Sequence, residues 1–331
     1  QVGLFTLIRV GLNSAYRMVY PFLTAFARGL GVDVETFSLV LTGRSLLGLA
    51  APFLAPLADR RGRKVSMLLG LGLYTLGAGA VALFPSLGTF VLALLLTQLG
   101  NYVFLPAMQA YLGDRVPYAR RGRVMAVTEL SWSLAFIAGV PVLGWLLGGQ
   151  GWPAPFALLA GLGVACLIVI ALFIPNAKPV LQQDGNGRSL QPGGLRQVLT
   201  LPAALAALLM GFSLTAANEV INLMFGVWLE DSFGLQLGAL AASAAVIGLS
   251  ELGGESLTVA LVDRLGKRRA VGIGIAANTL AALLLGLLGR SEWGALLGLF
   301  LFYLTFEFTM VSCLPLISAV APGARATLMA A

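Results

Sequence analysis

The sequence predicts an all-α membrane protein that crosses the bilayer several times. Of its 331 residues, 58% are hydrophobic and 11% are charged, and the mean hydropathy is +0.91. A soluble domain carries about 25% charged residues. Apolar runs long enough to cross ~30 Å of hydrocarbon recur along the chain. We expect these runs to be helices, because a helix satisfies its own backbone polar groups inside the bilayer.

A charged loop occurs twice in the chain at a spacing that indicates an internal duplication. Residues 59–64 read Asp-Arg-Arg-Gly-Arg-Lys between two apolar runs, and residues 263–268 read Asp-Arg-Leu-Gly-Lys-Arg between two others. The offset is constant, since 263 − 59 and 266 − 62 both equal 204. We therefore expect two related halves.

Residues 55–64 resemble the signature loop between the second and third spans of major facilitator superfamily transporters, roughly G-x-L-A-D-R-x-G-R-K. Ala55 stands where that family usually has glycine, and the second copy also sits where the family has it. The resemblance covers essentially the whole chain and implies the prokaryotic 12-span type, with two pseudo-symmetric six-helix bundles. The residues that we assign to gating are Asp59, Arg60, Gly62, Arg63, Asp263, Arg264 and Gly266.

Ten spans are predicted in the given sequence, at 3–26, 37–57, 65–84, 87–112, 122–147, 152–175, 202–228, 236–262, 270–288 and 294–318. A polar, Gly- and Pro-rich stretch separates the sixth from the seventh. We expect an N-terminal bundle at 1–175, a cytoplasmic linker at 176–201 and a C-terminal bundle at 202–331, which holds spans seven to ten and the start of an eleventh. By this count the natural protein continues into spans eleven and twelve.

Loop charge predicts the orientation of the chain. With the N-terminus in the cytoplasm, the inner loops hold sixteen basic residues, whereas the outer loops hold Arg28 and Arg290. Positive residues collect on the cytoplasmic side of membrane proteins. We therefore expect a multi-pass protein of the cell inner membrane with a cytoplasmic N-terminus.

Several classes of function are disfavoured by the composition. The net charge is +7, but the basic residues lie in short loops and form no basic face, which argues against a nucleic-acid partner. The chain has no histidine, and Cys166 and Cys313 both lie in apolar spans. This pattern predicts no metal site, no cofactor and, without a clear nucleophile–base pair, no enzyme.

Charged residues inside the predicted spans indicate which helices surround a polar cavity. A charge at mid-bilayer costs several kcal/mol on insertion scales, so it usually faces a cavity or a partner. The predicted spans three, six and nine have none, and we expect them to face lipid. The charged residues of the other spans are Arg9, Arg17, Arg44, Glu129, Glu219, Glu251, Glu255 and Glu307.

The basic residues among these are predicted to lie at different depths in the membrane. Arg17, beside Tyr16 and Tyr20, is suited to bind an anionic group or to neutralise a carboxylate. Arg9 and Arg44 lie nearer the membrane faces, where we expect them to snorkel.

The acidic residues are the candidates for reversible protonation. Glu251 and Glu255 are four residues apart and share one helix face, and burial disfavours the charged form of a carboxylate. The alternatives are that Glu255 braces the loop near Arg264 and that Glu129 pairs with inner-loop arginines. The predicted substrate and coupling residues are Arg17, Tyr20, Gln98, Asn101, Glu129, Glu219, Glu251, Glu255 and Glu307.

Residues 139–144, Gly-Val-Pro-Val-Leu-Gly, resemble the family's antiporter motif, commonly G-P-x-x-G-G, in a broken form. Their alternative use is close packing of helices through small residues. The family's usual arginine in span four is missing here, so coupling cannot depend on it.

These features favour a proton-coupled exporter of a small, partly apolar organic molecule that works by alternating access, and we expect a monomer. A proton-coupled symporter of a small metabolite is the main alternative. A transporter-like protein that binds a lipid, a pigment or a partner subunit without turnover is the rival class.

We predict that Asp59→Asn impairs transport cycling far more than ligand binding, because Asp59 is placed to cap the next span and to accept from loop arginines outside the substrate site. Exchange rates and ligand affinity, measured on the same preparation, check this. A collapse of affinity at unchanged exchange rates would contradict the gating role.

Overall fold

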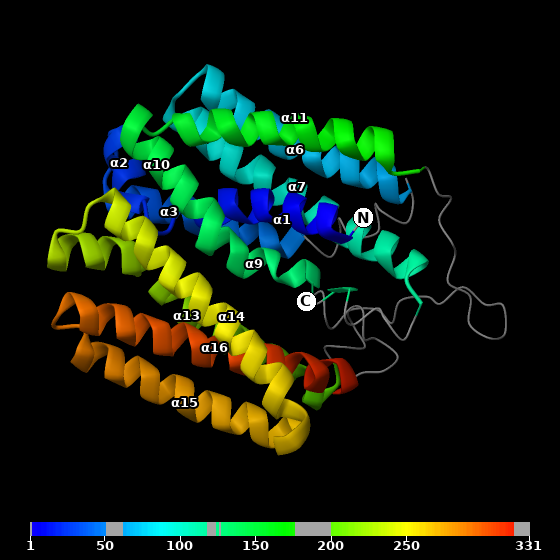
Figure 1. The fold of residues 1–331 in the computed structure, drawn as a ribbon, viewed down its shortest axis with the longest axis vertical. Helices are drawn as coiled ribbons and strands as arrows, with labels where there is room; N and C mark the ends of the chain where they lie inside the picture. The colour runs from blue at the N-terminus through cyan, green and yellow to red at the C-terminus, as the bar shows by residue number, and fades with distance from the viewer. Residues whose placement is uncertain (1, 51–61, 118–123, 126, 176–199, 321–331) are drawn as a thin grey trace. The chain divides into compact units, whose positions relative to one another are not determined.

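The computed structural model describes residues 2–50, 62–117, 124–125, 127–175 and 200–320. Their secondary structure is helical, without a strand. The elements of the first half are α1 Val2–Arg17, α2 Leu23–Leu30, α3 Val34–Leu46, the 3₁₀ helix η1 Leu47–Ala50, α6 Arg63–Leu83, α7 Leu87–Arg115, α9 Ser131–Leu134, the π-helix η2 Ala135–Gly139, α10 Val140–Gln150 and α11 Ala154–Phe173. Those of the second half are α13 Pro202–Phe233, α14 Leu237–Leu265, α15 Lys267–Leu288 and α16 Glu292–Val320 (Figure 1).

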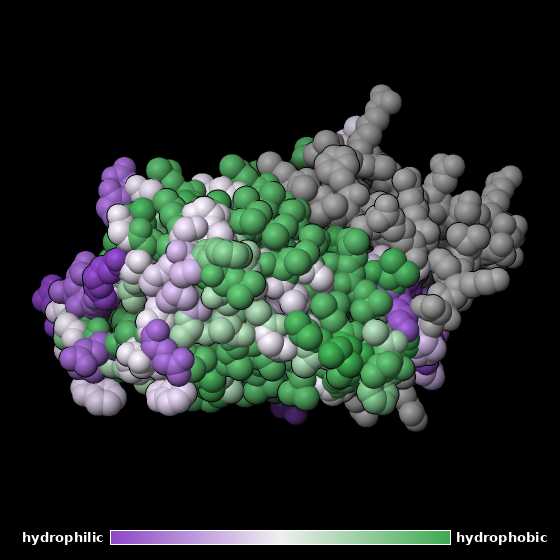
Figure 2. All heavy atoms as spheres, turned by 90° about the horizontal axis from the view of Figure 1, so that it is seen from above, coloured by the Kyte–Doolittle hydropathy of each residue, from purple (hydrophilic) through white to green (hydrophobic). Residues whose placement is uncertain are grey.

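Eight helical segments of the described chain are long and apolar enough to cross a membrane. The first of these segments starts at Arg63. They are α6, α7, residues 127–150, α11, α13, α14, α15 and Glu292–Leu314 of α16. Figure 2 shows hydrophobic side chains over most of the face that it displays, with hydrophilic ones gathered toward its ends. The predicted all-α membrane fold is thus confirmed for this part of the chain.

The first predicted span, 3–26, is not one continuous helix. It divides into α1 and α2, with residues 18–22 between them. Pro21 explains the break, because a proline inside a helix removes one hydrogen bond and its ring clashes with the carbonyl four residues earlier, here that of Arg17. The Tyr20 N–H instead donates to the Arg17 carbonyl over 3.3 Å.

The second predicted span starts three residues earlier than expected, at Val34. Asp33 caps it by accepting a 2.7 Å bond from the Thr36 N–H. The hydrogen bonds from Thr36 lower the pKa of this exposed carboxyl, which lies in the loop between the first two spans. After η1 the span continues into 51–61, outside the described residues.

Span five contains a π-helical turn just before a proline. The N–H of Val140 bonds to the carbonyl of Ala135, five residues back. Pro141 has no N–H to offer the preceding turn, and a π-bulge is one of the ways in which a helix absorbs such a gap.

The contacts group the chain into two compact units, residues 1–181 with 237–241 and residues 182–236 with 242–331. In the first unit, α6 packs along α7 and α11 covers α6. One end of this unit is held by aromatic rings around Phe90, whose centroid lies 5.4–5.7 Å from those of Phe37, Phe26 and Phe156. These rings join α2, α3, α7 and α11.

The second unit repeats part of this packing. Here α15 packs along α16, as α6 does along α7. Gly70 lies against Phe104 and Gly274 lies against Phe308, and both pairs of positions differ by 204 residues. A Cβ at either glycine would come within 3.2 Å of its neighbour. The duplication in sequence is therefore also a repeat of helix contacts.

The two charged loops share one backbone conformation at their glycines. Gly62 has φ 90° and ψ 150° and precedes α6, while Gly266 has φ 80° and ψ 137° and precedes α15. Asp59 and Arg60 lie outside the described residues. In the part that is described, Arg63 is buried and pairs with Asp114 at the end of α7 over 3.4 Å.

In the second loop, Asp263 and Arg264 are exposed. The gating role assigned to both loops remains a proposal.

The positive φ at Gly266 generates a stability prediction. A Cβ there would meet no atom within 4 Å, so any cost of Gly266→Ala comes from the backbone alone. We expect it to lower the free energy of unfolding by about 1–3 kcal/mol, the cost of holding a non-glycine residue in a sparsely populated positive-φ conformation. Thermal unfolding in detergent measures this.

Gly272→Ala is the matched control. This glycine lies inside α15, also with open space around it and without a positive φ. Alanine is preferred to glycine in a helix interior by up to ~1 kcal/mol, so the control should unfold at the same or a higher temperature. Equal losses in both variants would contradict the backbone argument.

Candidate functional site

One face of α1 carries a polar stripe. Arg9, Asn13, Tyr16, Arg17 and Tyr20 recur at intervals of three and four residues, which places them along one side of the chain as far as the break. All but Tyr16 are at most 5% exposed. A buried polar stripe needs partners from neighbouring helices.

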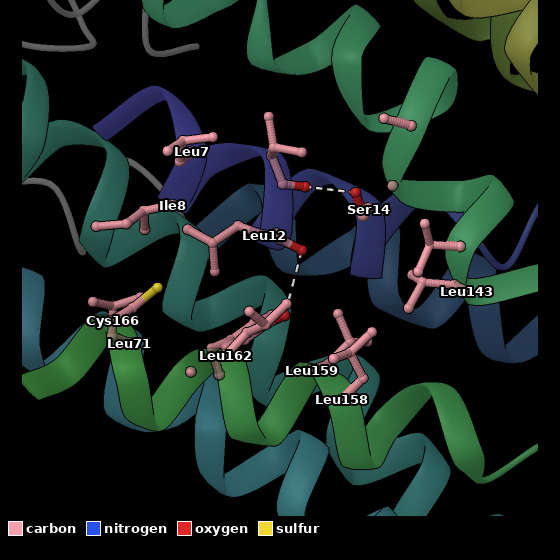
Figure 3. Close-up of a pocket in the computed structure, with 17 residues that line it drawn as sticks. Leu7, Ile8, Leu12, Ser14, Leu71, Leu143, Leu158, Leu159, Leu162 and Cys166 are labelled. Atoms are coloured by element: carbon pink, nitrogen blue, oxygen red, sulfur yellow. Dashed lines mark hydrogen bonds between the residues drawn. The ribbon is translucent and has the colours of Figure 1, made fainter. Parts of the chain in front are cut away.

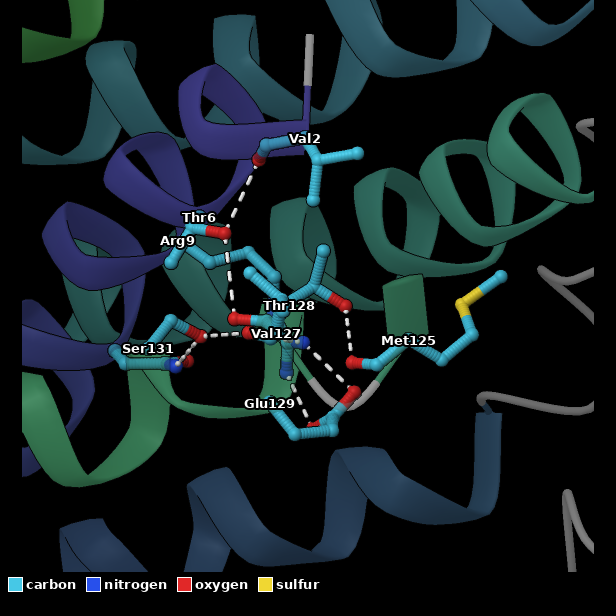
Figure 4. A network of polar contacts seen from close by, with 9 residues as sticks. Val2, Thr6, Arg9, Met125, Val127, Thr128, Glu129 and Ser131 are labelled. Carbon is cyan, nitrogen blue, oxygen red and sulfur yellow. Dashed lines mark hydrogen bonds and ion pairs between the residues drawn. The ribbon is translucent and has the colours of Figure 1, made fainter. Parts of the chain in front are cut away.

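The inner part of the stripe bonds to the start of span five. Both guanidinium nitrogens Nη1 and Nη2 of Arg9 donate to the carboxylate of Glu129, over 2.7 and 2.9 Å, and Nη1 also donates to the carbonyl of Thr128 (Figure 4). The Asn13 amide donates to the Ser131 hydroxyl over 3.1 Å. Arg9 therefore does not snorkel, and Glu129 pairs with this span-one arginine.

Further along, Arg17 lies among aromatic rings. Its guanidinium carbon is 3.4 Å from the centroid of the Phe136 ring and 4.5 Å from that of Trp132, and Nη1 donates to the Trp132 carbonyl over 3.0 Å. Its exposure is 2%. Cation–π contacts of this kind strengthen when they are desolvated.

The partners of Arg9, Asn13 and Arg17 on span five advance in the same direction as the arginines themselves, from 129 through 131 to 132 and 136. Spans one and five therefore run parallel. That is what two odd-numbered spans do in a chain whose direction reverses at every span.

Arg44 on α3 occupies a second aromatic site, which the sequence reasoning missed. Its Nη2 donates to the Tyr20 hydroxyl over 2.8 Å, and its guanidinium carbon lies 4.1 Å from the centroid of Tyr16. With 1% exposure it is a buried residue and does not snorkel at the membrane face. The signal was present in the two tyrosines four residues apart, one on α1 and one in the break after it.

The polar residues predicted on span four lie on α7. Gln98 is buried and hydrogen-bonds Tyr102, which also interacts with Tyr16 and Arg44. Asn101 is half-buried. Tyr102 is thus bonded to Gln98 and lies within the electrostatic reach of Arg44, which itself bonds to Tyr20.

In the second unit, Glu219 on α13 belongs to a short polar chain. The Asn222 amide donates to Glu219 over 3.4 Å, and the Tyr303 hydroxyl on α16 donates to the amide oxygen of Asn222. Glu219 is half-buried, whereas Asn222 and Tyr303 are buried. This chain joins the first and last described helices of the unit.

One of the remaining predicted carboxylates lies against a glycine of α14. A Cβ at Gly254 would lie 2.5 Å from the carbonyl oxygen of Leu304 and 2.8 Å from Cβ of Glu307, so α16 approaches α14 closely there. Glu251 and Glu255 lie on α14 itself, one turn before and one residue after Gly254. The contact of Glu307 with α14 is one that the sequence could not show.

Their burial differs. Glu251 is 2% exposed, while Glu255 and Glu307 are half-buried. Within the described ranges, no group of three or more His, Cys, Asp or Glu side chains is placed to hold a metal ion.

The antiporter-like segment packs against the broken first span. A Cβ at Gly139 would overlap the Ser14 side chain, and one at Gly144 would overlap the Phe22 ring. Both glycines therefore permit close contact between span five and the region on either side of the break.

Comparison with known proteins gives a consistent result. A family model described as Major Facilitator Superfamily matches residues 6–331. The uncharacterized MFS-type transporter YwfA of Bacillus subtilis is 27% identical over 274 residues, which cover 80% of this chain and 65% of the relative. The multi-drug resistance efflux pump PmrA homolog of Lactococcus lactis is 29% identical over 181 residues, 52% of this chain and 44% of the relative.

Among solved structures, a bacterial homolog of the human lysosomal transporter Spinster, inward-facing and unoccupied, superposes with a TM-score of 0.77 at 16% identity. The match covers 99% of this chain and 76% of that one. This likeness concerns the fold. The chain spans less than two thirds of the length of the curated relatives named above.

We predict that the two partners of the Arg9–Glu129 pair contribute unequally to stability. The Arg9 side chain is 6% exposed and that of Glu129 is 49% exposed. Glu129→Gln leaves a buried cation with a weakened partner, whereas Arg9→Met leaves a half-exposed carboxylate. Removing one partner of a buried pair costs ~3–5 kcal/mol, and exposure reduces this toward ~1 kcal/mol.

We therefore expect Glu129→Gln to lower the unfolding temperature more than Arg9→Met, and the double variant to resemble Arg9→Met. Thermal unfolding of the three proteins in one detergent measures the order. The reverse order would show that the pair does not stabilise the buried guanidinium.

Proposed function

Because the chain belongs to the Major Facilitator Superfamily, we propose that the whole protein is a secondary active transporter, which moves a small organic solute across the bacterial inner membrane by alternating access. The membrane-length helices and the superposition on a transporter fold support this. The proposed orientation has the N-terminus in the cytoplasm, from the loop charges, and the proposed working unit is a monomer of two halves, 1–175 and 202–331.

The proposed direction is export. Two relatives have names that describe drug efflux. One is the Lactococcus lactis protein, and the other is a multidrug resistance protein B homolog of Mycobacterium tuberculosis, which is 26% identical over 194 residues. Gly139 and Gly144 of the antiporter-like segment pack against the broken first span, and this packing is consistent with a structural role for the segment.

The proposed coupling ion is the proton, and one observation carries this proposal: Glu251 is 2% exposed in the middle of α14, a helix of 29 residues. A carboxyl group inside the membrane is unusual and usually functional. Glu251 is the proposed proton carrier. Glu307, which lies against Gly254 of the same helix, is the second candidate.

The proposed solute contacts lie in the first unit. Around Arg17 and Arg44 are the rings of Tyr16, Trp132 and Phe136, which offer flat apolar surfaces next to guanidinium donors. Such a surface suits a partly apolar organic molecule with a hydrogen-bond-accepting or anionic group.

Glutamine variants test the coupling. Glu→Gln mimics the protonated acid, so we expect Glu251→Gln or Glu307→Gln to abolish transport driven by a pH gradient and to preserve ligand binding. The ligand comes from a thermal-shift screen of metabolites and drugs, since binding raises the melting temperature. Flux is then measured in proteoliposomes that contain the full-length protein.

Glu35→Gln is the control, because Glu35 is an exposed acid in the first turn of α3. It should retain full gradient-driven flux. If both spanning variants also retain it, the proton does not use these residues. If wild-type protein binds the ligand but never moves it, a binding protein without turnover is the better conclusion.

A further inference from the structure

The first unit contains an apolar cavity apart from the charged stripe of α1. It lies among α1, α6, η2, α10 and α11 and has a volume of about 280 Å³ (Figure 3). The walls include Leu12, Leu71, Leu143, Leu159 and Cys166. Engineered cavities of ~150 Å³ with such walls stay dry and accept small hydrocarbons, and this one is larger.

The few polar atoms in its wall are already satisfied within the protein. The Ser14 hydroxyl donates to the carbonyl of Val10 over 2.6 Å, and the Tyr74 hydroxyl donates to the carbonyl of Gly11 over 3.3 Å. The lining contains no Asp, Glu, Lys or Arg. A water molecule needs two to four polar partners to settle in a cavity, so this cavity favours a hydrocarbon occupant.

The rim of the cavity opens on the apolar outer surface of the unit. Leu7 is 71% exposed, Val142 is 50% exposed and Leu162 is 43% exposed, and all three line it. Val142 and Leu162 lie on helical segments long and apolar enough to cross a membrane, so we expect the surface around the rim to face lipid chains. The occupant can therefore enter directly from the membrane.

The walls are held in place by close helix contacts at small residues. Gly139 touches Ser14 and Gly163 touches Thr75, which ties η2 to α1 and α11 to α6 on two sides of the cavity. A Cβ at either glycine would clash, whereas one at Gly11 in the wall would meet nothing within 4 Å. The cavity is thus a preformed space between fixed walls.

We propose that this cavity binds an acyl chain of a membrane phospholipid, which enters sideways between α1 and α11. The bound chain packs against the side of α1 formed by Ile8, Gly11 and Leu12, while the polar stripe of the same helix carries Arg17. The lipid then supports α1 from behind the proposed solute contacts. This binding does not depend on transport activity.

Photocross-linking tests the proposal. The full-length protein is placed in vesicles of phosphatidylethanolamine and phosphatidylglycerol doped with a phospholipid that carries a diazirine midway along one acyl chain. After illumination, we expect cross-links concentrated on the peptides that contain residues 7–14 and 158–166. Cross-links spread evenly over the exposed apolar surface would overturn the proposal.

Filling the cavity sharpens the test. We expect Gly11→Leu to lower cross-linking at these peptides about tenfold, the factor implied by the lost burial of two methylene groups. Gly72→Leu on α6 is the matched control, since that glycine also has open space around it but does not line the cavity. It should cross-link like the wild type.

If Gly11→Leu does not fold, Ala138→Leu changes a lining residue on η2 and should give the same loss. Undiminished cross-linking in a folded cavity-filling variant would overturn the proposal. Displacement of the probe by free fatty acid, but not by unlabelled phospholipid, would assign the site to a different ligand, and displacement by the transported solute would make it part of the transport path.

Discussion

The need to satisfy every charge inside a hydrocarbon layer governs the first unit. A guanidinium that is buried there has to find its partners in the protein. Arg9, Arg17 and Arg44 do so in three ways: with a carboxylate, with rings and a backbone carbonyl, and with tyrosines. Because the partners of the first two lie on span five, these contacts fix the register of α1 along that span.

In the second unit, glycines determine which groups of neighbouring helices come into contact. At Gly254 the absence of a side chain lets two helix backbones approach, and Glu307 of α16 is brought against α14. Gly274 does the same for the next helix pair, against Phe308. Small residues thus decide which chemical groups become neighbours, although they carry no chemistry themselves.

Much of the fold could be predicted from the sequence, because hydrophobic length and loop charge are local properties. The later spans and the repeated loop were found this way, and Gly62 and Gly266 share one conformation. The break at Pro21 was missed because the apolar run continues across it. The contact of Glu307 with Gly254 and the aromatic site of Arg44 depend on helix crossings, which no local pattern encodes.

The buried break interrupts the mechanical continuity of the first span. Residues 18–20 and 22 are at most 2% exposed, so the interrupted backbone is screened from lipid by the rest of the protein. On one side, α2 is anchored through Phe26 in the aromatic cluster; on the other, α1 is anchored through its arginines. A continuous helix would act as a stiff rod between these anchors. Five residues outside the helices interrupt that rod at a buried point, so the two anchors hold two separate helices.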